Sequence, residues 1–140
     1  ITAMHIAVRT SLPDNPLFID GNPEQLGKTI MSLLNNGMYA IAKKYGKKAY
    51  PAEIGLALES KDGQAVIRLY DNGVGIEQSI LDKIFDPFFT TKTTGEAAGI
   101  GLYLSKEIIL NHHGQIAVRS EKDELTEFTI TLPLWEEKSV

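Results

Sequence analysis

The stretch YDNGVGI, residues 70–76, ends an alternating apolar run with a carboxylate, an amide and two glycines. A carboxylate such as Asp71 accepts hydrogen bonds, so it suits the exocyclic amine of adenine and is a poor partner for the carbonyl of guanine. Gly73 and Gly75 lack a Cβ and allow the backbone to approach a flat ligand, with aliphatic Ile76 behind them. The same Asp-Asn-Gly order is also typical of an ordinary turn, in which the acid only caps the backbone.

A second glycine cluster, GIGL at residues 99–102, stands at the expected start of a helix. Unpaired N–H groups and the positive end of the helix dipole favour phosphate there, although glycines also occur at helix entries that bind nothing. Lys92, in the segment FFTTK, would supply a point charge for a terminal phosphate. Asn36 offers a neutral oxygen ligand for a magnesium ion that keeps most of its waters. The order of these groups indicates a nucleotide site.

The first part of the chain must position Asn36. Alternation predicts strands over residues 5–12 and 17–20, paired as a hairpin across PDNP. Asn22, followed by proline, marks the start of a helix that should run to about Lys44. Apolar residues at helical spacing form its core face: Leu26, Ile30, Leu33, Leu34, Gly37 and Ile41. Asn36 lies beside that face, on a rib that also contains Ser32, Tyr39, Ala40 and Lys43.

Two hairpins and two further helices complete the predicted architecture. Alternation over residues 53–60 and 65–70 predicts a hairpin that leads into Asp71, and the pattern over 115–120 and 127–133 predicts a closing hairpin. Between the hairpins we expect a short helix over residues 77–85, a long loop over 86–101, and a helix over 99–113 that stops at Gly114. The expected fold is α/β (α+β), a two-layer sandwich in which three helices cover one face of a mixed, mostly antiparallel sheet.

Composition limits the classes of protein to consider. The 140 residues are 43% hydrophobic, which suits one compact domain. The formal net charge is -4, whereas domains that wrap nucleic acid usually carry a basic excess, so we expect no nucleic-acid partner. The absence of cysteine excludes disulfides and thiolate metal sites. No apolar run approaches the roughly 20 residues of a membrane helix, and the opening ITAMHIAV suggests a piece of a longer polypeptide.

In this order, the motifs resemble the catalytic and ATP-binding (HATPase) domain of bacterial sensor histidine kinases. This domain belongs to the GHKL superfamily, with type II topoisomerase ATPases, MutL mismatch-repair proteins and large heat-shock chaperones. SLLNNGMYAI is similar to the N box, DNGVGI to the first glycine box, IFDPFFTTK to the F box and GIGLYLSKEII to the second glycine box. The resemblance covers residues 1–140 as a single domain and implies a Bergerat-type ATP-binding fold with an ATP lid over about 86–98. Phe85, Phe88 and Phe89 would anchor this lid or belong to the ordinary core.

The resemblance also implies roles for individual residues. Asp71 would bind the adenine amine, Thr126 would reach adenine through water, and Asn36 would coordinate magnesium. Gly73 and Gly75 would shape the pocket floor. The other nucleotide-binding residues that the resemblance implies are Ile76 and Ala40 at the base, and Lys43, Gly99, Ile100, Gly101 and Leu102 near the phosphates.

The chain departs from the family pattern at several positions. Ser32 stands where kinases usually have a second asparagine and where ATP-hydrolysing relatives have a glutamate, so efficient intrinsic hydrolysis is not expected. Ala97 and Ala98 alter the second glycine box, and the sequence KDEL replaces a glycine-rich turn before Thr126. These changes would lower the affinity for nucleotide without removing the pocket.

We therefore expect an ATP-binding catalytic domain that positions Mg-ATP for phosphoryl transfer to a histidine on a separate dimerisation and phosphotransfer domain, with a response regulator downstream. The phosphoacceptor lies outside this fragment, so no residue within it is assigned a catalytic role, and His5, His112 and His113 are expected to be structural or exposed. The domain is expected to be cytoplasmic and monomeric, within a parent protein that could be membrane-anchored.

Two alternatives remain open at this point. The first is a noncatalytic module of the same fold that binds nucleotide or a protein partner for regulation, which Ser32 and the pair Ala97 and Ala98 favour. The second is an ATPase switch of the chaperone or mismatch-repair kind, which the missing glutamate and the sequence DPFFTTK disfavour.

Overall fold

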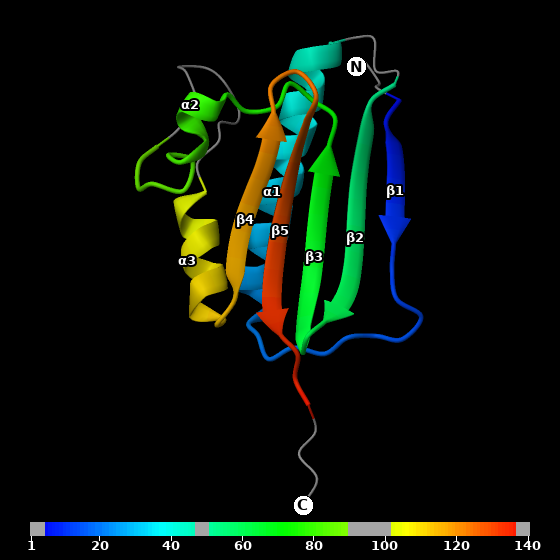
Figure 1. Cartoon of the computed structure of the whole chain (residues 1–140), viewed down its shortest axis with the longest axis vertical. Helices are drawn as coiled ribbons and strands as arrows, with labels where there is room; N and C mark the ends of the chain where they lie inside the picture. Colours follow the sequence, from blue (N-terminus) through cyan, green and yellow to red (C-terminus); the bar gives the residue numbers. More distant parts are fainter. Residues whose placement is uncertain (1–4, 47–50, 90–101, 137–140) are drawn as a thin grey trace, which may run out of the picture.

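A five-stranded sheet forms one layer of the protein (Figure 1). The computed structural model describes residues 5–46, 51–89 and 102–136. The strands are β1 (Ala7–Ser11), β2 (Glu53–Lys61), β3 (Gln64–Asp71), β4 (Gln115–Glu121) and β5 (Leu125–Pro133). They lie in the order β1-β2-β3-β5-β4, with β1 parallel to β2 and every other neighbouring pair antiparallel. The predicted mixed, mostly antiparallel sheet is confirmed.

Three helices form the second layer: α1 (Pro23–Tyr45), α2 (Gln78–Leu81) and α3 (Tyr103–Asn111). Figure 1 shows α1 running behind the central strands, with α3 beside it and α2 above α3. The main core lies between these helices and the sheet, where Leu33, Ile109 and Ile130 are buried together. The two-layer sandwich with helices on one face is confirmed. Within the described ranges, none of the helices has the length and apolar character needed to span a membrane.

Helix α1 begins and ends where its sequence predicts. The side chain of Asn22 accepts a hydrogen bond from the backbone N–H of Gln25 (3.0 Å), and the proline after it occupies the first turn, where no N–H is needed. Gly46, at φ 57°, follows the last turn. Of the predicted apolar face, Leu33, Gly37 and Ile41 are buried. The opposite face stays in solvent, so α1 lies flat on the sheet.

The N-terminal hairpin prediction is wrong. Residues 17–20 form no strand, and β1 pairs in parallel with β2 instead. The connection contains Pro13 and Pro16, which lack an N–H and cannot complete an antiparallel ladder. The backbone carbonyl of Phe18 accepts from the N–H of Trp135 (2.7 Å), and the two rings pack edge to face. This segment therefore passes the C-terminal end of β5 on its way to the start of α1.

Two smaller expectations also need correction. The predicted helix over residues 77–85 is helical only over Gln78–Leu81, and turns follow it. Gly114 does not provide the left-handed stop of α3, because that conformation falls on His113 at φ 63°. A Cβ on Gly114 would lie 2.2 Å from the carbonyl oxygen of Thr131, so the glycine is needed for the close approach to β5.

Candidate nucleotide-binding site

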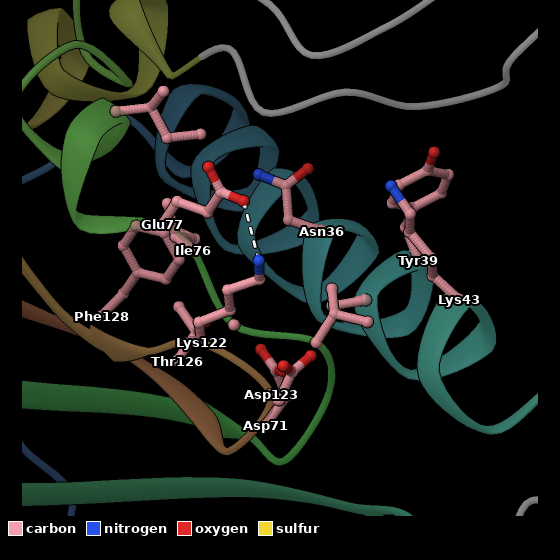
Figure 2. A pocket seen from close by; sticks show the side chains of 14 residues that line it. Asn36, Tyr39, Lys43, Asp71, Ile76, Glu77, Lys122, Asp123, Thr126 and Phe128 are labelled. Atoms are coloured by element: carbon pink, nitrogen blue, oxygen red, sulfur yellow. Dashed lines mark ion pairs between the residues drawn. The ribbon is translucent and has the colours of Figure 1, made fainter.

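A cavity of about 330 Å³ opens between α1, the loop after β3 and the turn between β4 and β5 (Figure 2). Such a volume is in the range of small-molecule sites. Its lining residues are Asn36, Tyr39, Ala40 and Lys43 from α1; Asp71, Thr126 and Phe128 from the sheet; and Val74, Gly75, Ile76, Glu77, Ile80, Lys122 and Asp123 from the remaining segments. The structure therefore brings together most of the residues predicted around an adenine ring.

Asp71 is a buried acid at the end of β3, only 6% exposed. One carboxylate oxygen accepts a hydrogen bond from the Gly73 N–H (2.9 Å). A Cβ on Gly37 of α1 would lie 3.4 Å from the other oxygen, so this glycine allows the helix to pass close to the acid. Within the described residues no cation forms an ion pair with Asp71. Burial raises its pKa to about 6, against the weaker lowering effects of the Gly73 N–H and the charge of Lys44.

Asn72, the neighbour of Asp71, has a structural role. Its side-chain oxygen accepts from the N–H of Glu53 (2.8 Å), and its amide nitrogen donates to the carbonyl of Pro51 (2.9 Å). Its own carbonyl accepts from the hydroxyl of Tyr45 (3.1 Å). These bonds join the start of β2, the end of β3 and the end of α1. The turn interpretation of the Asp-Asn pair thus applies to Asn72, whereas Asp71 faces the cavity.

The two glycines of this loop are required by contacts within the protein. A Cβ on Gly73 would lie 2.5 Å from the backbone carbon of Ala40, and the next N–H, of Val74, donates to the carbonyl of Ala40 (3.2 Å). Gly75 has φ 70°, and its Cβ would lie 2.2 Å from the carbonyl oxygen of Glu121. Gly75 lines the cavity, whereas Gly73 does not. Close packing within the protein thus requires both glycines, whether or not a ligand also approaches their backbone.

A row of three buried polar side chains crosses three strands next to the cavity, and two of the three line it. Thr126 on β5 is the register partner of Asp71 on β3 and of Ser120 on β4. The three residues are 3–6% exposed. Asp71 and Thr126 were predicted site residues, whereas Ser120 was not, although its position in the alternation of β4 places it on the same face as the apolar residues Ile116 and Val118.

Helix α1 contributes a polar wall to the site. Figure 2 shows Asn36, Tyr39 and Lys43 following one another along the helix. Together with Ala40 they are four of the five residues of the rib predicted from spacing, and all four line the cavity. Ser32 is exposed and is not among the lining residues.

The donor set limits how this wall could hold magnesium. In the described part of the chain no group of three or more acidic or histidine side chains could bind a metal ion. The amide oxygen of Asn36 is suited to a magnesium ion that keeps several waters and binds mainly to phosphates, so the residue present fits the expected ion.

The turn between β4 and β5 closes the outer side of the cavity. Lys122 forms an ion pair with Glu77 (3.0 Å), marked in Figure 2, and both side chains are more than half exposed. Asp123 adopts φ 64°, the left-handed conformation that a glycine would otherwise supply. Lys44 donates to the carbonyl of Asp123 (2.7 Å), which ties the turn to α1. The sequence KDEL thus forms a tight turn at the pocket without glycine.

The phosphate end of the predicted site lies largely outside the described residues. This applies to Lys92, Gly99, Ile100 and Gly101, to Ala97 and Ala98, and to most of the lid predicted over 86–98. Leu102 is described, and it is a core residue, 1% exposed, whose N–H donates to the carbonyl of Ile84 (3.0 Å).

The phenylalanines at the start of the predicted lid and just before it divide into two groups. Phe85 and Phe89 pack against the main core, which supports the ordinary core interpretation for both. Phe88 is fully exposed and has φ 65°, so it makes no comparable core contact.

Known proteins with similar sequences belong to the family that the motifs resemble. Residues 21–136 match the family described as histidine kinase-, DNA gyrase B- and HSP90-like ATPase, HATPase_c. The chain is 39% identical over 122 residues to the signal transduction histidine-protein kinase AtoS of Escherichia coli, covering 86% of this chain and 19% of that protein. It is 34% identical over 123 residues to sporulation kinase D of Bacillus subtilis, covering 88% of this chain and 22% of that kinase. The chain thus spans about a fifth of the length of these curated relatives.

Solved structures share the fold. The mycobacterial sensor histidine kinase MprB is similar with a TM-score of 0.71 and 25% identity, covering 92% of this chain and 82% of that one. A nucleotide-free catalytic domain of the histidine kinase ThkA has a TM-score of 0.75 at 22% identity, covering 91% and 80%. The buried acid, the cavity beside it and these matches agree: the chain belongs to the HATPase_c family and is a catalytic ATP-binding domain of the sensor histidine kinase type.

Proposed function

We propose that the cavity binds the adenine base of Mg-ATP, with the carboxylate of Asp71 accepting a hydrogen bond from the exocyclic amine. The single observation that carries this proposal is the burial of Asp71 in the cavity without a cationic partner among the described residues. A buried acceptor of this kind gains most from a ligand that donates to it. Ile76 and Phe128 supply the apolar surfaces that a flat ring needs.

The phosphates would extend from the base along α1. Lys43 would contact them through its charge, and Asn36 would hold the magnesium ion. That ion, when bound, supplies neutralisation of the negative charge on the phosphates. A contact from Lys92 remains a prediction from its charge and its place in the sequence. Contacts from Gly99, Ile100, Gly101 and Leu102, and closure by a lid over 86–98, remain predictions from the family resemblance.

The domain would position ATP for transfer of its terminal phosphoryl group to a histidine of another domain. The relatives are sensor kinases much longer than this chain, which supports a dimerisation and phosphotransfer domain elsewhere in the parent protein. In the described residues His112 is tied into the fold, because its ring nitrogens bond the N–H of Asn22 (2.9 Å) and the carbonyl of Ile108 (2.7 Å). The attacking imidazole would therefore come from outside this chain, and a response regulator would receive the phosphoryl group afterwards.

Calorimetric titration with a nonhydrolysable ATP analogue and magnesium tests the binding. Asp71→Ala should weaken binding by about 1–3 kcal/mol, as expected for the loss of a buried polar partner. Asp14→Ala, which removes an exposed acid outside the cavity, is the matched control and should bind like the wild type. Wild-type affinity in Asp71→Ala would overturn the adenine assignment.

Phosphoryl transfer is tested by mixing the domain with the purified dimerisation domain of its parent protein. Acid-labile phosphohistidine on that domain is the expected product. Good nucleotide binding without transfer would support the noncatalytic regulatory alternative instead. Steady release of phosphate by the isolated domain would favour an ATPase switch, which the absence of an acidic side chain from the α1 wall of the cavity disfavours.

A further inference from the structure

We propose that Ser120 is a positioning residue that holds the hydroxyl of Thr126 as a pure hydrogen-bond acceptor toward the base. This inference rests on the proposed function, since it concerns the same cavity. Ser120 is 3% exposed and does not line the cavity, so it can act on a ligand only through a neighbour. Thr126 is 4% exposed and does line the cavity.

The hydrogen bonds of Ser120 determine where its proton lies. Its hydroxyl is 2.7 Å from the carbonyl oxygen of Leu125, and a carbonyl can only accept, so Ser120 donates its one proton there. The N–H of Ile76 donates to the same hydroxyl oxygen (2.8 Å), because a backbone N–H can only donate.

The third contact of this hydroxyl decides the orientation of Thr126. The two hydroxyl oxygens are 2.9 Å apart, and the proton of Ser120 is already used. Thr126 must therefore donate its own proton to Ser120. Its lone pairs are left for the cavity, beside the carboxylate of its register partner Asp71.

The inner end of the cavity consequently presents two acceptors side by side. An amino group, or water bound to it, satisfies them by donating, whereas an oxo group in the same place adds a third acceptor and is repelled. Without Ser120, the proton of Thr126 becomes free to turn toward the cavity and to bond an oxo group. Ser120 thus increases the preference for a 6-aminopurine over a 6-oxopurine without touching either base.

The ratio of affinities for ADP and inosine diphosphate, measured by calorimetry, tests this inference. Ser120→Ala should lower the preference for ADP by about three- to tenfold, the range typical of one hydrogen bond. A general loss of stability is also expected, because the N–H of Ile76 loses its acceptor. Such a loss would weaken the binding of both nucleotides together and would leave the ratio of their affinities unchanged. An unchanged ratio in a folded Ser120→Ala protein would overturn the proposal.

A double-mutant cycle with Thr126→Val separates an effect through Thr126 from any other. In the valine background, Ser120→Ala should no longer change the ratio, because no hydroxyl remains to be turned. An equal change in both backgrounds would overturn the proposal. Thr126→Ser, which keeps the hydroxyl, should retain the wild-type preference, as should Thr129→Val on the same strand but outside the cavity.

Thr126→Val alone keeps the proposal testable if Ser120→Ala does not fold. It leaves the Ser120 bonds to Leu125 and Ile76 in place and should itself lower the preference for ADP. An unchanged preference in this variant would overturn the proposal. Failure of the wild-type domain to bind either nucleotide would instead overturn the proposed function and this inference with it.

Discussion

Asp71 and Thr126 lie directly opposite each other on β3 and β5, and both side chains are buried at the inner end of one cavity. Register partners in an antiparallel pair point to the same face of the sheet, so this pairing aims both polar groups toward α1. The hydrophobic residues that surround them give a buried acid the neighbours that raise its pKa. The same arrangement lowers the stability of the nucleotide-free domain when the acid is ionised. It also favours the binding of a ligand that donates a hydrogen bond to the acid.

Asp71→Asn should stabilise the nucleotide-free domain at pH 8 by about 1–3 kcal/mol. The folded-state pKa of about 6 lies above the value of 3.8 for an unperturbed Asp. Between these two pKa values the folded state therefore binds more protons than the unfolded state. The contribution of Asp71 to the free energy of unfolding is fully present below about pH 4 and is lost as the pH rises through 6. The stability advantage of Asp71→Asn over the wild type should decrease toward pH 4. Urea unfolding between pH 4 and pH 8 measures this difference in the free energy of unfolding.

The exposed acid Asp14 provides the control for this pH series. Asp14→Asn should follow the wild-type dependence of the free energy of unfolding on pH. If Asp71→Asn retained the wild-type dependence as well, Asp71 would not be the buried titrating group described above. Nucleotide binding by Asp71→Asn should still be weaker at pH 8, because an amide is a poorer acceptor than a carboxylate.

Gly75→Ala and Gly27→Ala should change stability in opposite directions. At Gly75 a methyl group would lie 2.2 Å from a backbone oxygen and the residue would keep φ 70°, so we expect a loss of more than about 2 kcal/mol. At Gly27, inside α1, a Cβ meets nothing within 4 Å, so alanine should stabilise the helix by about 0.5–1 kcal/mol. Thermal unfolding of both variants beside the wild type measures the difference. Equal effects would contradict the close packing of the glycine loop on the β4–β5 turn.

Asn72→Ala should destabilise the domain by about 1–3 kcal/mol, because the N–H of Glu53 and the carbonyl of Pro51 lose their partner. Asn35→Ala, at an exposed position of α1, is the matched control and should be neutral or slightly stabilising. Chemical unfolding gives both values. A stability loss no larger than that of the control would show that the Asn72 contacts contribute little.

His112→Ala should cost about 1–2 kcal/mol of stability. The histidine joins the end of α3 to the start of α1 through the N–H of Asn22, so its removal leaves that N–H and the carbonyl of Ile108 without their side-chain partner. His113→Asn is the control, since asparagine tolerates the positive φ of that residue. Urea unfolding should separate the two variants, and matching stabilities would argue that the link between the helices is unimportant.

The elements whose signals are local were predictable from the amino-acid sequence. The cap at Asn22, the apolar face of α1 and the alternation of β2, β3, β4 and β5 each depend on neighbouring residues, and the structure agrees with them. The rib from Asn36 to Lys43 was also predictable, because helical spacing fixes which side chains share a side. The resemblance to known kinases then supplied the expectation that this rib and Asp71 share a site.

Features that depend on pairing between distant segments became visible only in the folded protein. Periodicity does not reveal that β1 lies beside β2, or that β5 lies between β3 and β4 and so brings Thr126 to Asp71. The role of Ser120 follows from three partners that meet only in the folded sheet. Strand order is fixed by burial and loop closure across the whole chain, which is why the hairpin predicted at residues 17–20 was wrong while the local patterns held.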